Sequence, residues 1–398
     1  MRKALLTGLF FSCFINISIT YSQDRKALED QKKKISSEIA YTNKLLSEVK
    51  KQGAMTLDEI SLLDKKISLR KKMIQTISRE LRELNKGINK NQKKITELEF
   101  ELAVLKEDYA SLIELSYKTK NTQSWLMYVF ASEDLAQANK RTRYLKEISK
   151  LRERQAALIE LSKSQIQEKN AVLISQKDSK KQLLIKEQSE KKELDRDKNT
   201  KEFQLSNIKG NEQDLRAKLK KKEEQRKRLA KEIERLIAAE MKPKSGKVEF
   251  SLTPEEKLIG GNFVKNKGKL PWPVERGVIT GRFGSHPHPE LKGIVVTNNG
   301  IDISTEKGAM VRTVFKGTVT GLINIPGAGQ AVMVKHGSYW TVYSNLAQVF
   351  VSKGETVDTK ESIGTLLQEG STSKAHIEFW MHSSGGMRKL DPIRWIAN

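Results

Sequence analysis

The chain has 398 residues, a formal net charge of +24 and one cysteine, Cys13. This length is sufficient for two or three domains, and a single cysteine excludes a disulfide framework and thiolate metal sites. Residues 270–398 carry 13 basic and 10 acidic side chains, which leaves +21 of the charge in residues 1–269. The basic part favours an anionic membrane surface or an acidic protein partner, although a well-solvated charged helix explains it equally well.

Residues 1–22 have the pattern of a secretory signal peptide. A basic start precedes an apolar run to about Ile19, and small residues lead to an expected cleavage near Gln23. The run is short for a membrane span, and an uncleaved N-terminal anchor is the minor alternative. We therefore predict a protein that is soluble outside the cytoplasm, where a nucleic-acid partner is not expected.

Helix-breaking residues divide the chain near residue 240. All eight prolines lie at Pro243 or beyond, whereas residues 24–240 contain only three glycines. Because proline and glycine both interrupt helices, the first part can form long helices and the second cannot. We predict a coiled coil over residues 23–240, a linker over 241–268 and a C-terminal domain over 269–398.

An apolar residue recurs in alternating steps of three and four from Ile60 to Leu112, interrupted only by Arg70 and Asn91. A 3.5-residue period held this long predicts a coiled coil about 80 Å in length. Polar residues at core positions commonly fix the register, and we assign that role to these two.

The seam breaks near residues 118–134, and a second, weaker helical stretch follows to Ala239, with heptad spacing recovered around Lys222 and Arg226. Two long helices with a break between them favour an antiparallel hairpin, and a parallel coil between two chains is the alternative. An apolar patch in the break either docks a partner or seals the hairpin end. The patch residues are Trp125, Met127, Tyr128 and Phe130.

A short helix is predicted in the linker. A capping box with proline at the first helical position begins at Thr253, and Gly260 and Gly261 are expected to end the helix after Ile259. A helix of about six residues is unstable alone in water, so we expect it to lie against the following domain.

From Trp272 the sequence predicts short strands. Runs such as GVITGRF, QAVMVKH and AHIEFWM are rich in β-branched and aromatic residues and are separated by glycines. This pattern favours a compact antiparallel sheet or barrel. The expected fold class is therefore α+β with several domains: a long antiparallel coiled-coil hairpin followed by a small, mainly β domain.

Five blocks follow one another within residues 270–396: GRFGSHPHP, NNGIDISTEKGAMVRTVFKGTV, VMVKHGSYWTVYSNL, VSKGETVDTKESIG and AHIEFW. In this order they resemble the blocks of the LytM/lysostaphin-type zinc endopeptidase domain. With the signal peptide and the coiled coil, the whole chain resembles the EnvC-like murein hydrolase activators of Gram-negative bacteria. The resemblance implies a LytM-like C-terminal domain and a periplasmic location, associated with the inner-membrane division complex.

Active members of the LytM family bind zinc through a histidine, an aspartate four residues later and the second histidine of a His-x-His strand. By resemblance, Asp302 and His376 match the aspartate and the second strand histidine. Asn298, Lys374 and Asn345 stand where the family has histidines, so three of five positions have lost an imidazole. The resemblance therefore implies a degenerate domain with no catalytic residue and no cofactor.

The chemistry of the remaining donors agrees with this interpretation. A catalytic zinc needs three protein ligands, and Asp302 with His376 supplies two, because an asparagine carbonyl is a poor ligand. Lys374 lies two residues before His376, on the same face of the strand, and we expect its ammonium to pair with Asp302. Asn345 cannot act as a base. We expect no rescue by the other histidines, which are His286, His288, His336 and His382.

The resemblance implies a non-catalytic activator of periplasmic N-acetylmuramoyl-L-alanine amidases, which split septal peptidoglycan during daughter-cell separation. It also implies that the coiled coil docks onto an FtsEX-type division complex and that a helical arm, for which the helix at 254–259 is a candidate, restrains the LytM groove. Two alternatives stay open: a zinc endopeptidase with altered ligands, and a non-catalytic peptidoglycan-binding protein. The candidate partner-binding residues are Asn298, Asp302, Tyr343, Asn345, Lys374 and His376.

Overall fold

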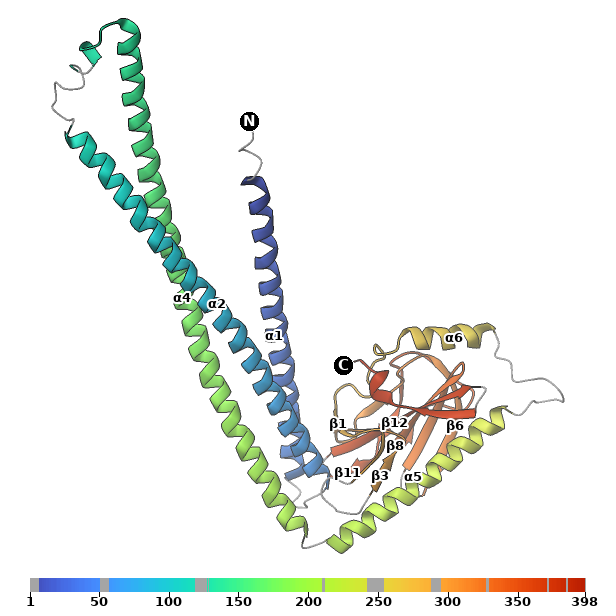
Figure 1. The fold of residues 1–398 in the computed structure, drawn as a ribbon. Helices are drawn as coiled ribbons and strands as arrows, with labels where there is room; N and C mark the ends of the chain where they lie inside the picture. Colours follow the sequence, from blue (N-terminus) through green and yellow to red (C-terminus); the bar gives the residue numbers. More distant parts are fainter. Residues whose placement is uncertain are drawn as a thin grey trace. The chain divides into compact units, whose positions relative to one another are not determined.

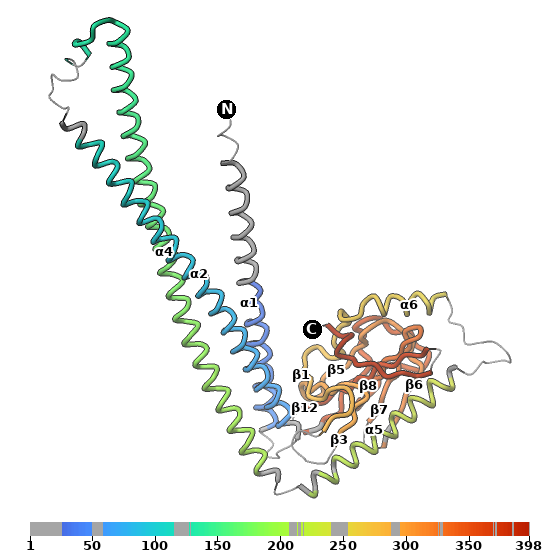
Figure 2. The backbone as a smooth tube through the Cα atoms, in the orientation of Figure 1, coloured from blue at the N-terminus to red at the C-terminus, as the bar shows by residue number. Residues whose placement is uncertain are grey.

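The computed structural model describes the residues 7–50, 57–118, 127, 129–209, 212–241, 254–287, 295–326, 329–370, 372–383 and 386–397 (Figures 1 and 2). The chain divides into two compact units, Met1–Glu29 with Ile74–Glu190, and Asp30–Met73 with Lys191–Asn398. The start of the predicted signal peptide, Trp125, Tyr128 and the capping residue Thr253 lie outside the described residues.

The helices of the described chain are α1 (Thr7–Lys50), α2 (Leu57–Lys118), α4 (Leu135–Lys209), α5 (Glu212–Met241) and α6 (Pro254–Lys265). The predicted break lies between the end of α2 and the start of α4. The coiled-coil region was predicted with that one break, but α1 and α2 are separate helices, as are α4 and α5. Within the described residues, no helix combines the length and the apolar character needed to cross a bilayer.

The helices α2 and α4 run antiparallel. As the residue number rises along α2, the number of the residue that it contacts on α4 falls. The antiparallel hairpin predicted from the sequence is therefore confirmed, and it forms within one chain. The pairs are Asp64–Lys201 and Arg70–Asp197 in the second unit, and Ser78–Glu187 and Asn91–Gln176 in the first.

Both polar residues of the apolar seam have partners on α4. Arg70 is 7% exposed, and its Nε lies 2.6 Å from Oδ2 of Asp197. Lys66 approaches the other oxygen of the same carboxylate at 2.7 Å. Asn91 Nδ2 donates to Gln176 Oε1 at 3.0 Å. Because a buried charge is costly without its partner, sliding the helices past one another is unfavourable, which agrees with the predicted role in register.

The C-terminal domain consists mainly of antiparallel strands and closes with the 3-10 helix η1 (Pro392–Arg394). The strands are β1 (Val278–Gly281), β2 (Gly284–Pro287), β3 (Val295–Asn298), β4 (Gly300–Glu306), β5 (Met310–Arg312), β6 (Gly317–Ile325), β7 (Gly329–His336), β8 (Tyr339–Val349), β9 (Thr356–Val357), β10 (Ser362–Leu366), β11 (Gln368–Glu369), β12 (Thr372–Ser383) and β13 (Gly386–Leu390). The main sheet has the order β1-β4-β12-β8-β7-β6-β9, while β2 pairs with β3. The predicted small, mainly β domain is confirmed.

The helix α6 is part of the core of this domain. Phe263 is fully buried, and its ring stacks on His336 at 4.9 Å and on Trp395 at 5.1 Å between centroids. The prediction that Gly260 and Gly261 end the helix is wrong, because α6 continues to Lys265. A Cβ on Gly260 would lie 3.4 Å from the His336 carbonyl oxygen, so this glycine permits close packing of the helix on the turn after β7.

The helix α5 covers the opposite face of the sheet, alongside β6 in Figure 1. Its apolar side chains pack on strand residues whose side chains point away from the main core, since successive residues of a strand face opposite sides. The resulting cluster comprises Leu229, Ile233 and Ile237 of α5 with Ile323, Ala331, Met333, Trp340, Val342 and Trp380 of the sheet.

The adjacent ends of α1 and α2 pack on the β1 edge of the same sheet. Leu45 and Leu62 share an apolar cluster with Val278 of β1. The Tyr41 hydroxyl donates to the Arg276 carbonyl at 3.2 Å, and the Arg276 guanidinium lies 4.3 Å from the centre of the Tyr41 ring. This edge strand is therefore covered rather than free to pair with another chain.

Candidate functional site

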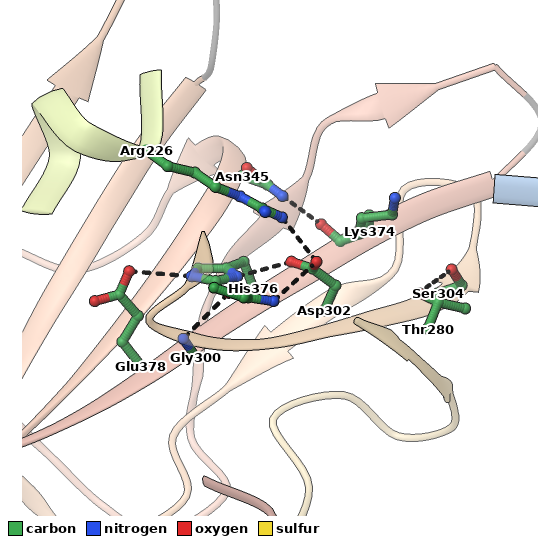
Figure 3. A network of polar contacts seen from close by, with 10 residues as sticks. Arg226, Thr280, Gly300, Asp302, Ser304, Asn345, Lys374, His376 and Glu378 are labelled. Atoms are coloured by element: carbon green, nitrogen blue, oxygen red, sulfur yellow. Dashed lines mark hydrogen bonds and ion pairs between the residues drawn. The ribbon is translucent and has the colours of Figure 1, made fainter. Parts of the chain in front are cut away.

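The register of β4 and β12 places Asp302 directly opposite His376. The Asp302 Oδ1 and the His376 Nδ1 are 2.8 Å apart (Figure 3). Asn298 ends β3, accepts the Gly300 backbone N–H at 3.2 Å and donates from Nδ2 to Asp302 Oδ2 at 3.1 Å. All three side chains are buried, with exposures of 2% for Asn298, 7% for Asp302 and 6% for His376. The structure thus brings together the three residues at the expected metal-ligand positions.

The second oxygen of Asp302 also accepts from Arg226, a residue of α5 (Figure 3). The Arg226 Nη2 lies 2.8 Å from Asp302 Oδ2, and the Arg226 side chain is 31% exposed. Sequence reasoning did not identify this residue as part of the site. The available signal was a cation at a heptad core position three residues before Leu229.

His376 is held from its other side by Glu378, a further residue that sequence reasoning missed. The His376 Nε2 lies 3.1 Å from Glu378 Oε1, and Trp380 Nε1 donates to Glu378 Oε2 at 2.8 Å. The three residues alternate along β12 and therefore share one face. The period-two pattern His-x-Glu-x-Trp was the available signal.

The charges of this network fix its protonation. Burial raises the pKa of Asp302, but the Arg226 charge, the His376 hydrogen bond and charge, and the Lys374 charge together hold it well below its usual range. Burial lowers the pKa of His376, but its hydrogen bonds to Asp302 and Glu378 and their charges raise it to about 9. At neutral pH the site therefore holds a carboxylate, an imidazolium and a guanidinium in contact.

Lys374 was expected to neutralise Asp302, but another cation lies at hydrogen-bond distance from the Asp302 carboxylate. That cation is Arg226. The Lys374 charge is the last of the influences that lower the Asp302 pKa, and its ammonium is directed away from that carboxylate in Figure 3. We therefore replace the predicted pair with the Arg226–Asp302 pair.

The donor set does not fit a catalytic zinc. Asn298 turns its amide N–H towards Asp302, so the group at the first ligand position is a hydrogen-bond donor to the second. Both ring nitrogens of His376 already contact carboxylates. A zinc ligand needs a free lone pair, and a guanidinium in contact with Asp302 opposes a dication. In the described part of the chain, no group of three His, Cys, Asp or Glu side chains is arranged to hold a metal ion.

Asn345 lies beside the site, whereas Tyr343 lies in the core of the domain. Asn345 has φ 65°, which asparagine tolerates, and its Nδ2 donates to the Lys374 carbonyl at 3.0 Å beside the site. Tyr343 is 1% exposed and faces the core, where its hydroxyl accepts from the Val314 N–H at 2.8 Å. The prediction of Tyr343 as a partner-binding residue is therefore wrong.

The other histidines lie outside the site or outside the described residues. His336 is buried in the core; its Nδ1 contacts the Lys316 carbonyl at 2.7 Å, its Nε2 contacts the Thr341 hydroxyl at 2.8 Å, and burial lowers its pKa to about 4. His286 lies on β2 and His382 on β12, both half-buried, while His288 is not among the described residues.

The predicted apolar patch at the hairpin end is described only in part. Met127 is 66% exposed and Phe130 is 79% exposed. Trp125 and Tyr128 are not among the described residues.

Residues 296–392 match the family model of peptidase family M23. An uncharacterized metalloprotease of Haemophilus influenzae is 29% identical over 130 residues, covering 32% of this chain and 27% of the relative. The peptidoglycan DD-endopeptidase ShyA of Vibrio cholerae is 33% identical over 93 residues, covering 23% of this chain and 21% of that protein. The chain thus spans about a quarter of the length of the curated relatives it matches.

Among solved structures, a zinc-containing peptidase from Vibrio cholerae is 26% identical, with a TM-score of 0.28, covering 33% of this chain and 41% of that one. Csd3 from Helicobacter pylori is 22% identical, with a TM-score of 0.28, covering 33% of this chain and 36% of that one. The C-terminal domain is an M23, or LytM-type, domain.

Proposed function

We propose that the chain is a non-catalytic activator of periplasmic N-acetylmuramoyl-L-alanine amidases, in which the M23 domain binds the amidase instead of cleaving peptidoglycan. The observation that carries this proposal is the Arg226–Asp302 pair, in which a guanidinium contacts the carboxylate of an incomplete ligand set. An M23 domain without a usable ligand set retains its folded surface, and such a surface is suited to binding a protein.

The helix α5 is the candidate for the restraining arm. It places Arg226 on Asp302 and packs Ile233 on the sheet beside Trp340 and Trp380. The helix α6, which the sequence suggested for this role, is poorly suited to it, because withdrawing α6 would remove Phe263 from the core. Release of α5 would expose Trp340, Trp380 and the Asp302–His376 pair together, and we propose this face as the amidase-binding surface.

The coiled-coil hairpin is the proposed attachment to an FtsEX-type division complex at the inner membrane. The exposure of Met127 and Phe130, one helical turn apart just before α4, supports this assignment, because contiguous exposed apolar patches mark interaction sites. Export by residues 1–22 would place both regions in the periplasm.

The test is the release of dye from labelled peptidoglycan by a periplasmic amidase of the same organism. The assay compares the chain without residues 1–22, the variant Arg226→Glu with Ile233→Asp, and the control variant Arg228→Glu. We expect the chain to release dye only in the presence of amidase, and the double variant, with α5 displaced, to activate more strongly than the control. Sacculus binding without any effect on the amidase would contradict the proposal and support a wall-binding protein.

The alternative function is a zinc endopeptidase with altered ligands. The similarity to two peptidoglycan DD-endopeptidases of Vibrio cholerae favours it. It requires dye release by the chain alone, abolished by a chelator and restored by zinc. That outcome would mean that the described arrangement of Asn298, Asp302 and His376 rearranges to admit the metal.

A further inference from the structure

The helix α5 has two chemically different faces. The face on the sheet carries Leu229, Ile233 and Ile237, all buried. The opposite face is exposed and mainly basic, although Glu223, Glu224, Glu232 and Glu234 lie on it or at its borders. Its exposed cations are Lys220, Lys221, Lys227, Arg228, Lys231 and Arg235.

Part of this charge is neutralised within the protein. Lys227 pairs with Glu223 at 3.1 Å, whereas Glu234 is directed to a cation outside α5, Lys389 of β13, at 3.6 Å. Arg235 is bound by Glu232. The exposed cations outside these three pairs form what we call the outer basic patch: Lys220, Lys221, Arg228 and Lys231.

An anionic lipid bilayer is the partner that fits both faces. Lysine and arginine side chains are attracted to a negative bilayer surface, each strengthening binding roughly fivefold. A helix with a basic face and an apolar face is also the type that lies in the bilayer interface with its apolar side chains inserted. An acidic protein would bind the basic face alone, whereas a bilayer can also take up the apolar face, which otherwise packs on the sheet.

We propose that α5 is a membrane-surface helix whose outer basic patch docks onto an anionic lipid bilayer. The bilayer then competes with the M23 domain for Leu229, Ile233 and Ile237, so membrane binding draws α5 off the Asp302 site. The inference concerns α5 itself and holds whether the M23 domain activates an amidase, cleaves peptidoglycan or only binds it.

The test measures co-sedimentation of the chain without residues 1–22 with phosphatidylcholine vesicles, with and without phosphatidylglycerol. The patch variant combines Lys220→Gln, Arg228→Gln and Lys231→Gln. A control variant removes the same charge from exposed positions of α4, with Lys177→Gln, Lys181→Gln and Lys186→Gln. All six positions are exposed, and circular dichroism checks that both variants keep their helices.

We expect binding only to vesicles with phosphatidylglycerol, and a loss on the order of a hundredfold in the patch variant. The control variant should bind nearly as well as the unchanged chain. Equal losses in the two variants would overturn the proposal, because the attraction would then follow net charge alone. Binding to a polyglutamate peptide through the patch, without binding to vesicles, would overturn it in favour of an acidic protein.

Displacement of α5 has its own readout. Trp340 and Trp380 are at most 1% exposed and lie beneath α5. Vesicles with phosphatidylglycerol should increase the quenching of tryptophan fluorescence by acrylamide, and the Trp340→Phe, Trp380→Phe variant should lose this increase. Unchanged quenching in the vesicle-bound chain would overturn the competition between bilayer and M23 domain.

Discussion

Arg226 and Asp302, 76 residues apart in the sequence, form an ion pair with 2.8 Å between Nη2 and Oδ2. The carboxylate side of this pair is 10% exposed and the guanidinium side is 31% exposed. The pair links a helix of the coiled-coil region to the centre of the M23 sheet, so the state of the helix and the state of the site depend on one another.

Removal of the guanidinium should weaken the docking of α5. Arg226→Ala leaves Asp302 with His376 as its charged hydrogen-bond partner. Since the arginine is partly exposed, we expect the free energy of α5 docking to fall by about 1–2 kcal/mol. Hydrogen exchange of the α5 amides measures this local loss. Arg228→Ala, on the outer face, is the matched control and should change it by less than about 0.5 kcal/mol. Equal protection in the two variants would contradict the role of the pair.

Truncation of Phe263 and truncation of Ile233 should have different effects, because α6 belongs to the core of the domain and α5 docks on its surface. Phe263→Ala removes a ring at the centre of the core and should destabilise the whole C-terminal domain by about 3–5 kcal/mol. Ile233→Ala should cost about 2–4 kcal/mol of α5 docking while the domain beneath keeps its own unfolding transition. Urea unfolding combined with hydrogen exchange distinguishes the two. An Ile233→Ala effect spread over the entire sheet would show that α5 is an inseparable part of it.

The imidazolium at position 376 should make the protein less stable in alkali. The pKa of His376 is about 9 when folded, against about 6.5 when unfolded, so the folded state holds the extra proton between these values. The stabilisation is complete below pH 6.5 and is lost as the pH rises through 9, by at most about 3 kcal/mol. Urea unfolding from pH 6 to pH 10 should show this loss in the unchanged chain and not in His376→Gln.

The buried His336 should act in the opposite direction. Its pKa is about 4 when folded, so below pH 6.5 the unfolded chain binds the proton first. Stability is therefore lost as the pH falls from 6.5 to 4, by at most about 3 kcal/mol. His336→Gln should flatten this acid limb, although it lowers the overall stability. An acid limb of unchanged slope in that variant would assign the loss to other groups.

Restoring imidazoles should restore zinc binding only when the cation is removed as well. We expect Asn298→His with Lys374→His to bind zinc weakly, and the same variant with Arg226→Ala to bind it much more tightly, because three ligands then converge without a competing charge. Metal content after dialysis measures both. Tight zinc binding by the unchanged chain would contradict the account of the donor set.

The proximity of Asp302 and His376 could be predicted, because a short-range strand pattern places both residues on known motif positions. The contribution of Arg226 could not be predicted, because it depends on where a helix distant in the sequence docks. A cation at a heptad position is also compatible with pairing inside the coiled coil. Gly260 shows a similar limit: a glycine pair ordinarily ends a helix, but here it permits close packing. Tyr343 was misplaced because Asn345 has φ 65°, which breaks the regular alternation of β8, so residues 343 and 345 do not share a face.

The folded C-terminal domain includes α5 and α6. Phe263 of α6 is part of its core, and α5 covers Trp340 and Trp380. A fragment that starts at residue 269 would lack the ring between His336 and Trp395 and would present two bare indoles to water. Such a fragment should aggregate or pair with itself. A fragment that starts at Glu212 would keep both helices, so the smallest stable unit here is larger than the family match over residues 296–392 indicates.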